Sequence, residues 1–221
     1  MSLTITYLGH SGFLLDDGAH VLCIDPFLTG NPLAKHRPDG IRCNLVALTH
    51  GHADHVGDTV AIARANGAKV IASWELASFL AEHDVETEPG NPGGTIATDV
   101  ARVTFTFATH SSSYEGRYMG ANCGLVIAMG GVTVYHAGDT GLFGDMKLIG
   151  EIYRPDVAML PVGDRFTMDA KLASMAAEWI RPRIAIPIHF ATFPLLAADA
   201  RGFAPKGVEV QVMAAGDTLA I

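Results

Sequence analysis

The sequence THGHADH at residues 49–55 directly follows the apolar run LVAL. That run has the composition of a short buried strand, so three histidines and one aspartate lie at its end. On a helix, residues i and i+2 are about 200° apart, so His50 and His52 would not share a face there. In an extended or looped segment both can point to one side, as two ligands of one metal ion. Asp54 and His55 are adjacent and diverge, which favours a second metal over one strained four-ligand site.

Further metal-competent side chains follow predicted strands elsewhere in the chain. They are His110 after VTFTFAT, Asp139 in HAGDT and His189 after IAIPI. One histidine at a strand end is most often a structural hydrogen-bonding residue, and an aspartate in GDT is often a turn former. The repetition after several apolar strands is better explained by one shared site assembled from strand ends.

Strands and helices alternate along the rest of the chain, with a hairpin turn predicted at DDG, residues 16–18. Strands are predicted at 3–8, 13–15, 20–24, 45–48, 69–72, 101–106, 124–128, 132–135, 156–160, 184–188 and 208–212, and helices at 59–66, 74–83, 142–151 and 170–180. Hairpin strands followed by strand-and-helix units occur twice, which predicts an α/β protein of two packed sheets with helices outside. No linker divides the chain, so we expect one domain over residues 1–221.

Composition restricts the partners and the location that we expect. The chain is 49% hydrophobic and can bury a large core, whereas its net charge of −8 disfavours a nucleic-acid surface. Its three cysteines are widely spaced and form no CxxC pair, which is typical of reduced thiols. We see neither an export signal nor a membrane span. These features predict a cytoplasmic protein with no nucleic-acid partner.

The segment HGHADH at residues 50–55 resembles the HxHxDH signature of the metallo-β-lactamase superfamily, and the later order His, Asp, His is also similar. The resemblance spans almost the whole chain and implies a four-layer αββα sandwich with a binuclear site at one edge. It implies that the first metal is bound by His50, His52 and His110, the second by Asp54, His55 and His189, and that Asp139 bridges both.

The motifs LGHSGF, HAGDT, VGDRFTM and IPIHFATFP resemble a narrower group of cytosolic metal-dependent hydrolases. That group is related to a sugar-phosphate (ascorbate-6-phosphate) lactonase and to the N-acylphosphatidylethanolamine phospholipases. Two departures exclude other branches. The flavodiiron proteins have Glu at the position of His52, and the commonest secreted lactamases have Cys at that of Asp139. Relatives often form homo-oligomers, so self-association is a further expectation.

We therefore expect a binuclear hydrolase that uses a metal-bridging hydroxide on a small ester, lactone or phosphoester. Asp54 is the predicted catalytic residue, since its carboxylate can both ligate metal and accept a proton. Zinc is the expected metal, with manganese or iron as alternatives. Two other functions are kept open. One is a ribonuclease or other phosphodiesterase on the same scaffold, and the other is a non-catalytic metal-binding module.

Several residues near the motifs have roles that the sequence leaves open. Asp25 is predicted either to hold a ligand histidine or to form a turn before proline. Four more are expected mainly to make structural hydrogen bonds: His10, Ser111, His136 and Thr140. Candidates for clamping an anion or forming an apolar wall are Arg117, Arg165, Phe190 and Phe193.

Overall fold

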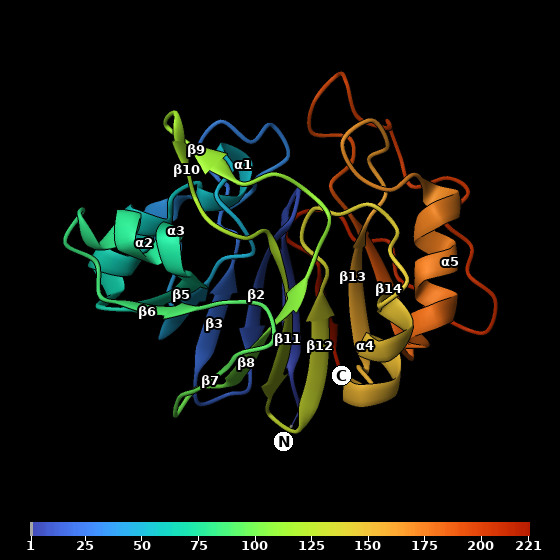
Figure 1. Cartoon of the computed structure of the whole chain (residues 1–221), viewed down its shortest axis with the longest axis horizontal. Coiled ribbons are helices and arrows are strands. Elements are labelled where there is room, and N and C mark those ends of the chain that lie inside the picture. Colours follow the sequence, from blue (N-terminus) through green and yellow to red (C-terminus); the bar gives the residue numbers. More distant parts are fainter. Residues whose placement is uncertain (1) are drawn as a thin grey trace.

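The computed structural model describes residues 2–221 and contains two seven-stranded sheets packed face to face. Helices cover the outer face of each sheet, so the layers run helix, sheet, sheet, helix (Figure 1). This arrangement confirms the predicted αββα sandwich. The apolar core between the sheets takes side chains from both of them, including Phe13 and Phe105, which are fully buried.

The first sheet has the strand order β16-β1-β2-β3-β4-β5-β6. Its strands are β1 (Thr4–Gly9), β2 (Gly12–Asp16), β3 (Val21–Ile24), β4 (Leu45–Ala47), β5 (Lys69–Ser73), β6 (Thr87–Gly90) and β16 (Thr218–Ala220). Strands β3 to β6 are parallel, so their carboxyl ends lie at the same edge. The THGHADH segment leaves β4 at that edge.

The second sheet has the order β15-β14-β13-β12-β11-β8-β7. Its strands are β7 (Thr95–Ala97), β8 (Arg102–Phe107), β11 (Cys123–Met129), β12 (Val132–His136), β13 (Val157–Pro161), β14 (Ile184–Ile188) and β15 (Glu209–Val210). Strands β12, β13 and β14 are parallel, which brings the segments after them to one edge. A separate hairpin, β9 (Ser113–Tyr114) with β10 (Arg117–Tyr118), projects from the connection between β8 and β11.

Helices α2 (Thr59–Asn66) and α3 (Trp74–Ala81) pack on the first sheet, and α4 (Met146–Tyr153) and α5 (Ala170–Ile180) pack on the second (Figure 1). A short 3-10 turn, η1, spans Pro38–Gly40. Helix α2 ends where Gly67 adopts a left-handed conformation, as the sequence predicts. Among residues 2–221, no helix has the length and apolar character needed to cross a bilayer.

Several predicted boundaries are wrong. Helix α4 begins at Met146 rather than at residue 142, after the Gly144 that breaks the periodic run. Helix α3 ends at Ala81, two residues early, and β15 is only two residues long. The motif also contains one helical turn, α1 (Ala53–Val56), where we expected only extended or looped chain.

Candidate metal centre

All seven predicted ligand side chains meet at one edge of the sandwich. They belong to the segment after β4, to α1, and to the connections that follow β8, β12 and β14. Their donor atoms form three overlapping groups in which every pair of atoms lies within 4.8 Å. The groups are His50, His52 and His110; His10, Asp54, His55 and His189; and His50, His55 and Asp139.

The first group consists of three histidines from two distant segments. His50 Nε2 lies 3.0 Å from His52 Nδ1, and the His110 ring is edge-on to both, with centroids 5.3 and 5.0 Å away. His52 is the extended residue that precedes α1, so the extended geometry expected for the pair is present. Helix α1 then turns the chain, which separates the direction of His52 from that of Asp54.

The second group lies on the other side of the motif. Asp54 Oδ2 is 3.1 Å from His10 Nε2 and 3.8 Å from His189 Nε2. The buried His189 has a left-handed backbone with φ of 59°. Gly163 packs directly against it, since a Cβ there would meet the His189 carbonyl oxygen. The glycine of VGDRFTM therefore lets the chain after β13 approach this histidine closely.

Asp139 lies between the two groups and contacts histidines of both. Its Oδ1 is 3.3 Å from His55 Nε2, and its Oδ2 is 2.9 Å from His189 Nε2 and 3.6 Å from His110 Nε2. The Asn122 amide nitrogen donates to the Asp139 carbonyl oxygen, which fixes this segment to the start of β11. The carboxylate is thus positioned to contact anything bound by either group.

Asp25 fixes the orientation of two of the histidines, His55 directly and His50 through Thr49. Its Oδ2 is 2.7 Å from His55 Nδ1 and also accepts the Thr49 hydroxyl at 2.7 Å. Because that hydroxyl proton is committed to Asp25, the Thr49 oxygen accepts from His50 Nδ1 at 3.0 Å. Both histidines therefore keep their Nδ1 protons and present Nε2 lone pairs to the interior of the site. Both roles open to Asp25 are observed, since its side chain holds His55 and its carbonyl oxygen accepts from the Phe27 amide at 2.8 Å in a turn around Pro26.

The arrangement of these lone pairs fits a bound cation. His55 Nε2 and Asp139 Oδ1 face each other at 3.3 Å, yet neither has a hydrogen-bond partner within residues 2–221. Two buried acceptors left facing each other are costly unless a positive charge lies between them. Imidazole and carboxylate groups are also the donors that divalent transition metals prefer. The donor set and its unpaired atoms therefore fit metal ions.

The electrostatics of the site point the same way. Burial alone lowers the pKa of His55, but the carboxylates of Asp139 and Asp25 outweigh it and raise that pKa well above its usual range. Burial raises the pKa of Asp139, whereas His189 and His55 lower it well below the usual range. The buried carboxylates thus favour positive charge at this point, supplied either by protons or by metal.

His10 makes a side-chain contact that its sequence position did not predict. Burial lowers the pKa of His10 to about 4, so the ring is neutral at neutral pH. Its Nδ1 lies 2.9 Å from the Thr192 hydroxyl and its Nε2 lies 3.1 Å from Asp54 Oδ2. The ionised Asp54 carboxylate can only accept, so His10 Nε2–H donates to it. The LGHSGF motif signalled this residue, but its partner comes from a different part of the chain.

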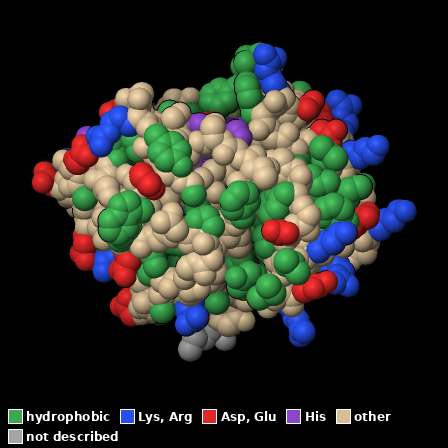
Figure 2. Space-filling model, in the orientation of Figure 1, with side chains coloured by type: hydrophobic (Ala, Val, Ile, Leu, Met, Phe, Trp, Pro, Cys, Tyr) green, Lys and Arg blue, Asp and Glu red, His purple; other side chains and the backbone are tan. Residues whose placement is uncertain are grey.

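A cavity of about 260 Å³ lies over the ligand groups. Its apolar wall is formed by Phe166, Phe193 and Leu196, and Figure 2 shows histidine side chains at the upper edge beside apolar ones. Phe193 thus has the predicted position, whereas Phe190 is partly buried and packs against the core cluster that includes α5. The other two wall residues, Phe166 and Leu196, were not singled out individually from the sequence.

Neither arginine proposed as an anion clamp lines this cavity. Arg117 makes two hydrogen bonds of 2.8 Å to Glu82 and stacks over Phe79, so its guanidinium is already paired. Arg165 is exposed and its guanidinium lies 5.6 Å from the Phe166 ring. Neither of these two candidates is therefore placed to clamp an anion over the ligand groups.

The remaining residues beside the motifs make hydrogen bonds. His136 Nε2 donates to the Ser11 carbonyl oxygen, and its Nδ1 accepts from the Gly138 amide. The Thr140 hydroxyl accepts from the Thr109 amide, while Ser111 Oγ lies 3.3 Å from His52 Nε2. These contacts agree with the structural roles predicted for His136 and Thr140.

A family model described as "Beta-lactamase superfamily domain" matches residues 4–189, which include every ligand candidate. The chain belongs to the beta-lactamase superfamily. Within the superfamily it is 45% identical to a UPF0173 metal-dependent hydrolase of Carboxydothermus hydrogenoformans, over 99% of this chain and 100% of the relative. A second UPF0173 metal-dependent hydrolase, from Thermoplasma acidophilum, is 49% identical over 91% of this chain and 89% of its own length.

Solved structures show the same architecture. Igni18, described as a novel metallo hydrolase from Ignicoccus hospitalis, superimposes with a TM-score of 0.91 and 37% sequence identity over 100% of this chain and 99% of its own. An isothiocyanate hydrolase from Delia radicum gut bacteria shares the fold, with a TM-score of 0.78 at 19% identity. Because its closely similar relatives are metal-dependent hydrolases, this chain is a metal-dependent hydrolase as well.

Proposed function

We propose that the chain is a binuclear metal-dependent hydrolase. The observation that carries this proposal is the division of the donor atoms into two histidine groups that both contact the Asp139 carboxylate. The first ion would be held by His50, His52 and His110, and the second by Asp54, His55 and His189, with Asp139 shared between them. Zinc suits this imidazole and carboxylate set best, and manganese and iron also accept it.

Divalent ions bound here would supply Lewis acidity and lower the pKa of a water molecule, which is the chemistry that hydrolysis of an ester, lactone or phosphoester needs. The chain's own residues complete the site. Asp54 is the most exposed of the site's carboxylates, with a side chain 25% exposed, and it lines the cavity. Burial raises its pKa, but the hydrogen bond from His10 and nearby histidine charge lower it below the usual range, so Asp54 is ionised and able to take a proton.

The apolar wall and the fold have supporting roles in this proposal. Phe166 and Phe193 limit the access of bulk water to the substrate, which strengthens the electrostatic interactions inside the cavity. We further propose that residues 1–221 form one domain, since the core between the sheets draws on both halves of the chain. A small-molecule substrate fits the size of the cavity.

The test compares Asp54→Asn with Asp84→Asn, a control at an aspartate whose side chain is 97% exposed. Both variants and the unmodified chain are loaded with zinc or manganese and assayed against esters, lactones and phosphodiesters. We expect Asp54→Asn to lower kcat about 100-fold or more, the usual contribution of a positioned proton acceptor, and Asp84→Asn to be unchanged. Unchanged turnover in Asp54→Asn would refute its role, and no hydrolysis by the loaded parent would leave a non-catalytic metal-binding module.

A further inference from the structure

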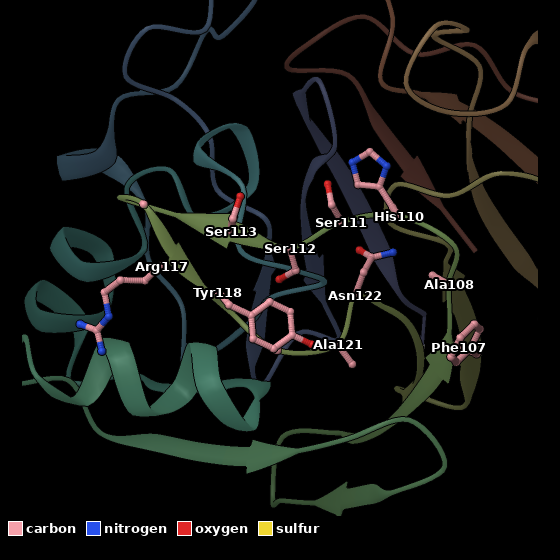
Figure 3. A pocket seen from close by; sticks show the side chains of 12 residues that line it. Phe107, Ala108, His110, Ser111, Ser112, Ser113, Arg117, Tyr118, Ala121 and Asn122 are labelled. Atoms are coloured by element: carbon pink, nitrogen blue, oxygen red, sulfur yellow. The ribbon is translucent and has the colours of Figure 1, made fainter.

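A groove of about 650 Å³ adjoins the cavity over the candidate metal centre. It is bounded by the end of β8 and the chain after it, by the β9–β10 hairpin, and by the approach to β11. His110 and Ser111 line both spaces. Figure 3 shows Tyr118 and Phe107 on opposite sides of the groove, with Asn122 between Ser112 and Ala108. A molecule bound over the ligand groups therefore has room to extend along the hairpin.

The hairpin is attached directly to the metal-binding segment. Ser112 Oγ accepts from the Gly51 amide at 3.1 Å, and the Ser112 carbonyl oxygen accepts from the Met119 amide at 3.1 Å. The Ser73 hydroxyl donates to the Met119 carbonyl oxygen at 2.8 Å. The base of the hairpin is thus fixed to the HGHADH segment and to the end of β5, so the groove is formed before any substrate binds.

The lining of the groove offers little positive charge to an anionic substituent. Among residues 2–221, Arg117 is the one lysine or arginine that lines either space, and its guanidinium is paired with Glu82 by two hydrogen bonds of 2.8 Å. Arg165 lies outside both sets of lining residues. An anionic group placed along the groove, away from the ligand groups, would find no unpaired lysine or arginine among the lining residues in the described range.

The walls instead offer apolar surface. The aromatic side chains of Tyr118 and Phe107 are 71% and 59% exposed, although exposing such rings to water is unfavourable. Ala108 and Ala121 line the floor between them. Phe193 continues an apolar wall beyond the ligand groups in the adjoining cavity. Together these surfaces match an uncharged substrate with an apolar substituent.

We propose that the substrate is an uncharged carboxylic ester whose apolar substituent lies in this groove against Tyr118, with its carbonyl carbon over the ligand groups. This inference rests on the proposed hydrolase function and narrows it. In the reaction the oxygen of water bonds to the carbonyl carbon and the bond from that carbon to the leaving oxygen breaks. The proton that Asp54 takes from water passes to the leaving oxygen, so the products are a carboxylic acid and an alcohol.

The experiment uses the metal-loaded full chain with 4-nitrophenyl acetate, 4-nitrophenyl hexanoate and bis(4-nitrophenyl) phosphate. Variants are Tyr118→Ala, Tyr118→Phe and the control Ile152→Ala, an apolar residue of α4 that is 65% exposed and lies outside both spaces. Binding of butyl 4-nitrophenyl ether, which cannot be hydrolysed here, is measured by equilibrium dialysis as a readout independent of turnover.

We expect both esters to be hydrolysed with higher kcat/KM than the phosphodiester. Tyr118→Ala should raise KM for hexanoate about tenfold and weaken ether binding to a similar extent, with kcat changed little, because the ring contributes binding that is uniform along the reaction. Tyr118→Phe and Ile152→Ala should resemble the parent.

A higher kcat/KM for the phosphodiester than for the esters would overturn the proposal. The proposal would also fail if Tyr118→Ala changed neither the KM for hexanoate nor the affinity for the ether. If no compound is hydrolysed, the proposed function fails. The dialysis measurement still decides whether the groove binds an uncharged apolar group.

Discussion

Asp25 links the two halves of the motif at the level of single atoms. It accepts from the Thr49 hydroxyl and from His55 Nδ1, and through Thr49 it also sets the proton position on His50. The backbone of Asp25 is left-handed, with φ of 41°, which is an unfavourable conformation for a non-glycine residue. The strain is offset by three hydrogen bonds made within the site.

The substitution Asp25→Asn should therefore weaken metal binding. An amide offers one acceptor oxygen and no negative charge, so His55 and Thr49 lose a shared acceptor. We expect the affinity for zinc to fall about 10- to 100-fold, the usual effect of losing such a partner of a ligand. Competition with a chromophoric chelator measures it. The control is Asp156→Asn, where the carboxylate accepts the Thr133 amide away from the site, and equal affinities in the two variants would contradict this role.

His10 is expected to position the Asp54 carboxylate. Its contact spans 44 positions of sequence and joins the β1–β2 turn to α1. His10→Ala removes the donor and should weaken zinc binding about tenfold, whereas His10→Gln keeps an N–H that can reach Asp54 and should restore part of the loss. Zinc titration calorimetry provides the comparison. If His10→Gln binds zinc as weakly as His10→Ala, the N–H of residue 10 does not position Asp54, and His10 would instead be a metal ligand itself.

Local sequence marks most ligand candidates but not their surroundings. His50, His52, Asp54 and His55 could be identified because they form one dense segment after an apolar strand. The partner of His10 could not be predicted, since it depends on how the β1–β2 turn meets α1 in the folded chain. Likewise, Arg117 resembled an anion clamp until the fold placed Glu82 beside it.

At the scale of elements, the close packing of the β9–β10 hairpin on the motif depends on Gly51. A Cβ at this position would lie 2.4 Å from Met119 Cβ and 2.5 Å from Met119 Cγ. Gly51→Ala should thus push the hairpin away and lower the free energy of unfolding by about 1–3 kcal/mol, as overpacking usually does. Urea denaturation measures this change.

The control for that experiment is Gly144→Ala, because a Cβ there meets no atom within 4 Å and its φ is not positive. Gly144→Ala should change the free energy of unfolding far less. If Gly51→Ala proves as stable as its control and binds butyl 4-nitrophenyl ether equally well, the hairpin is not fixed in the way described.

Long periodic elements were predictable, and short paired strands were not. The core strands β11 to β14 and helix α5 have apolar patterns that specify both their type and their position. Strands β6, β7 and β16 have the sequences TEPG, TIA and TLA, which carry little strand signal. They exist because a neighbouring strand offers an unpaired edge, as β1 does for β16. Such pairing is a property of the assembled sheet.

At the scale of the whole molecule, folding brings seven donor residues from four separate segments to one edge. The alternation of strands and helices predicted this architecture because parallel strands place their carboxyl ends together. The direction and spacing of the side chains at that edge came only with the structure. The buried Asp25 and Asp139 and the partly exposed Asp54 lie at this edge, and no lysine or arginine is among the cavity-lining residues in the described range 2–221.

The central claim is that this edge holds two metal ions that share Asp139. The most direct measurement is metal content by mass spectrometry after zinc titration and gel filtration, on the parent chain and on Asp54→Ala. We predict about two ions per chain for the parent and about one for Asp54→Ala, because the second ligand group loses a member while the histidine group of His50, His52 and His110 is intact. A parent chain that retains no zinc, or saturates at one ion, would contradict the account.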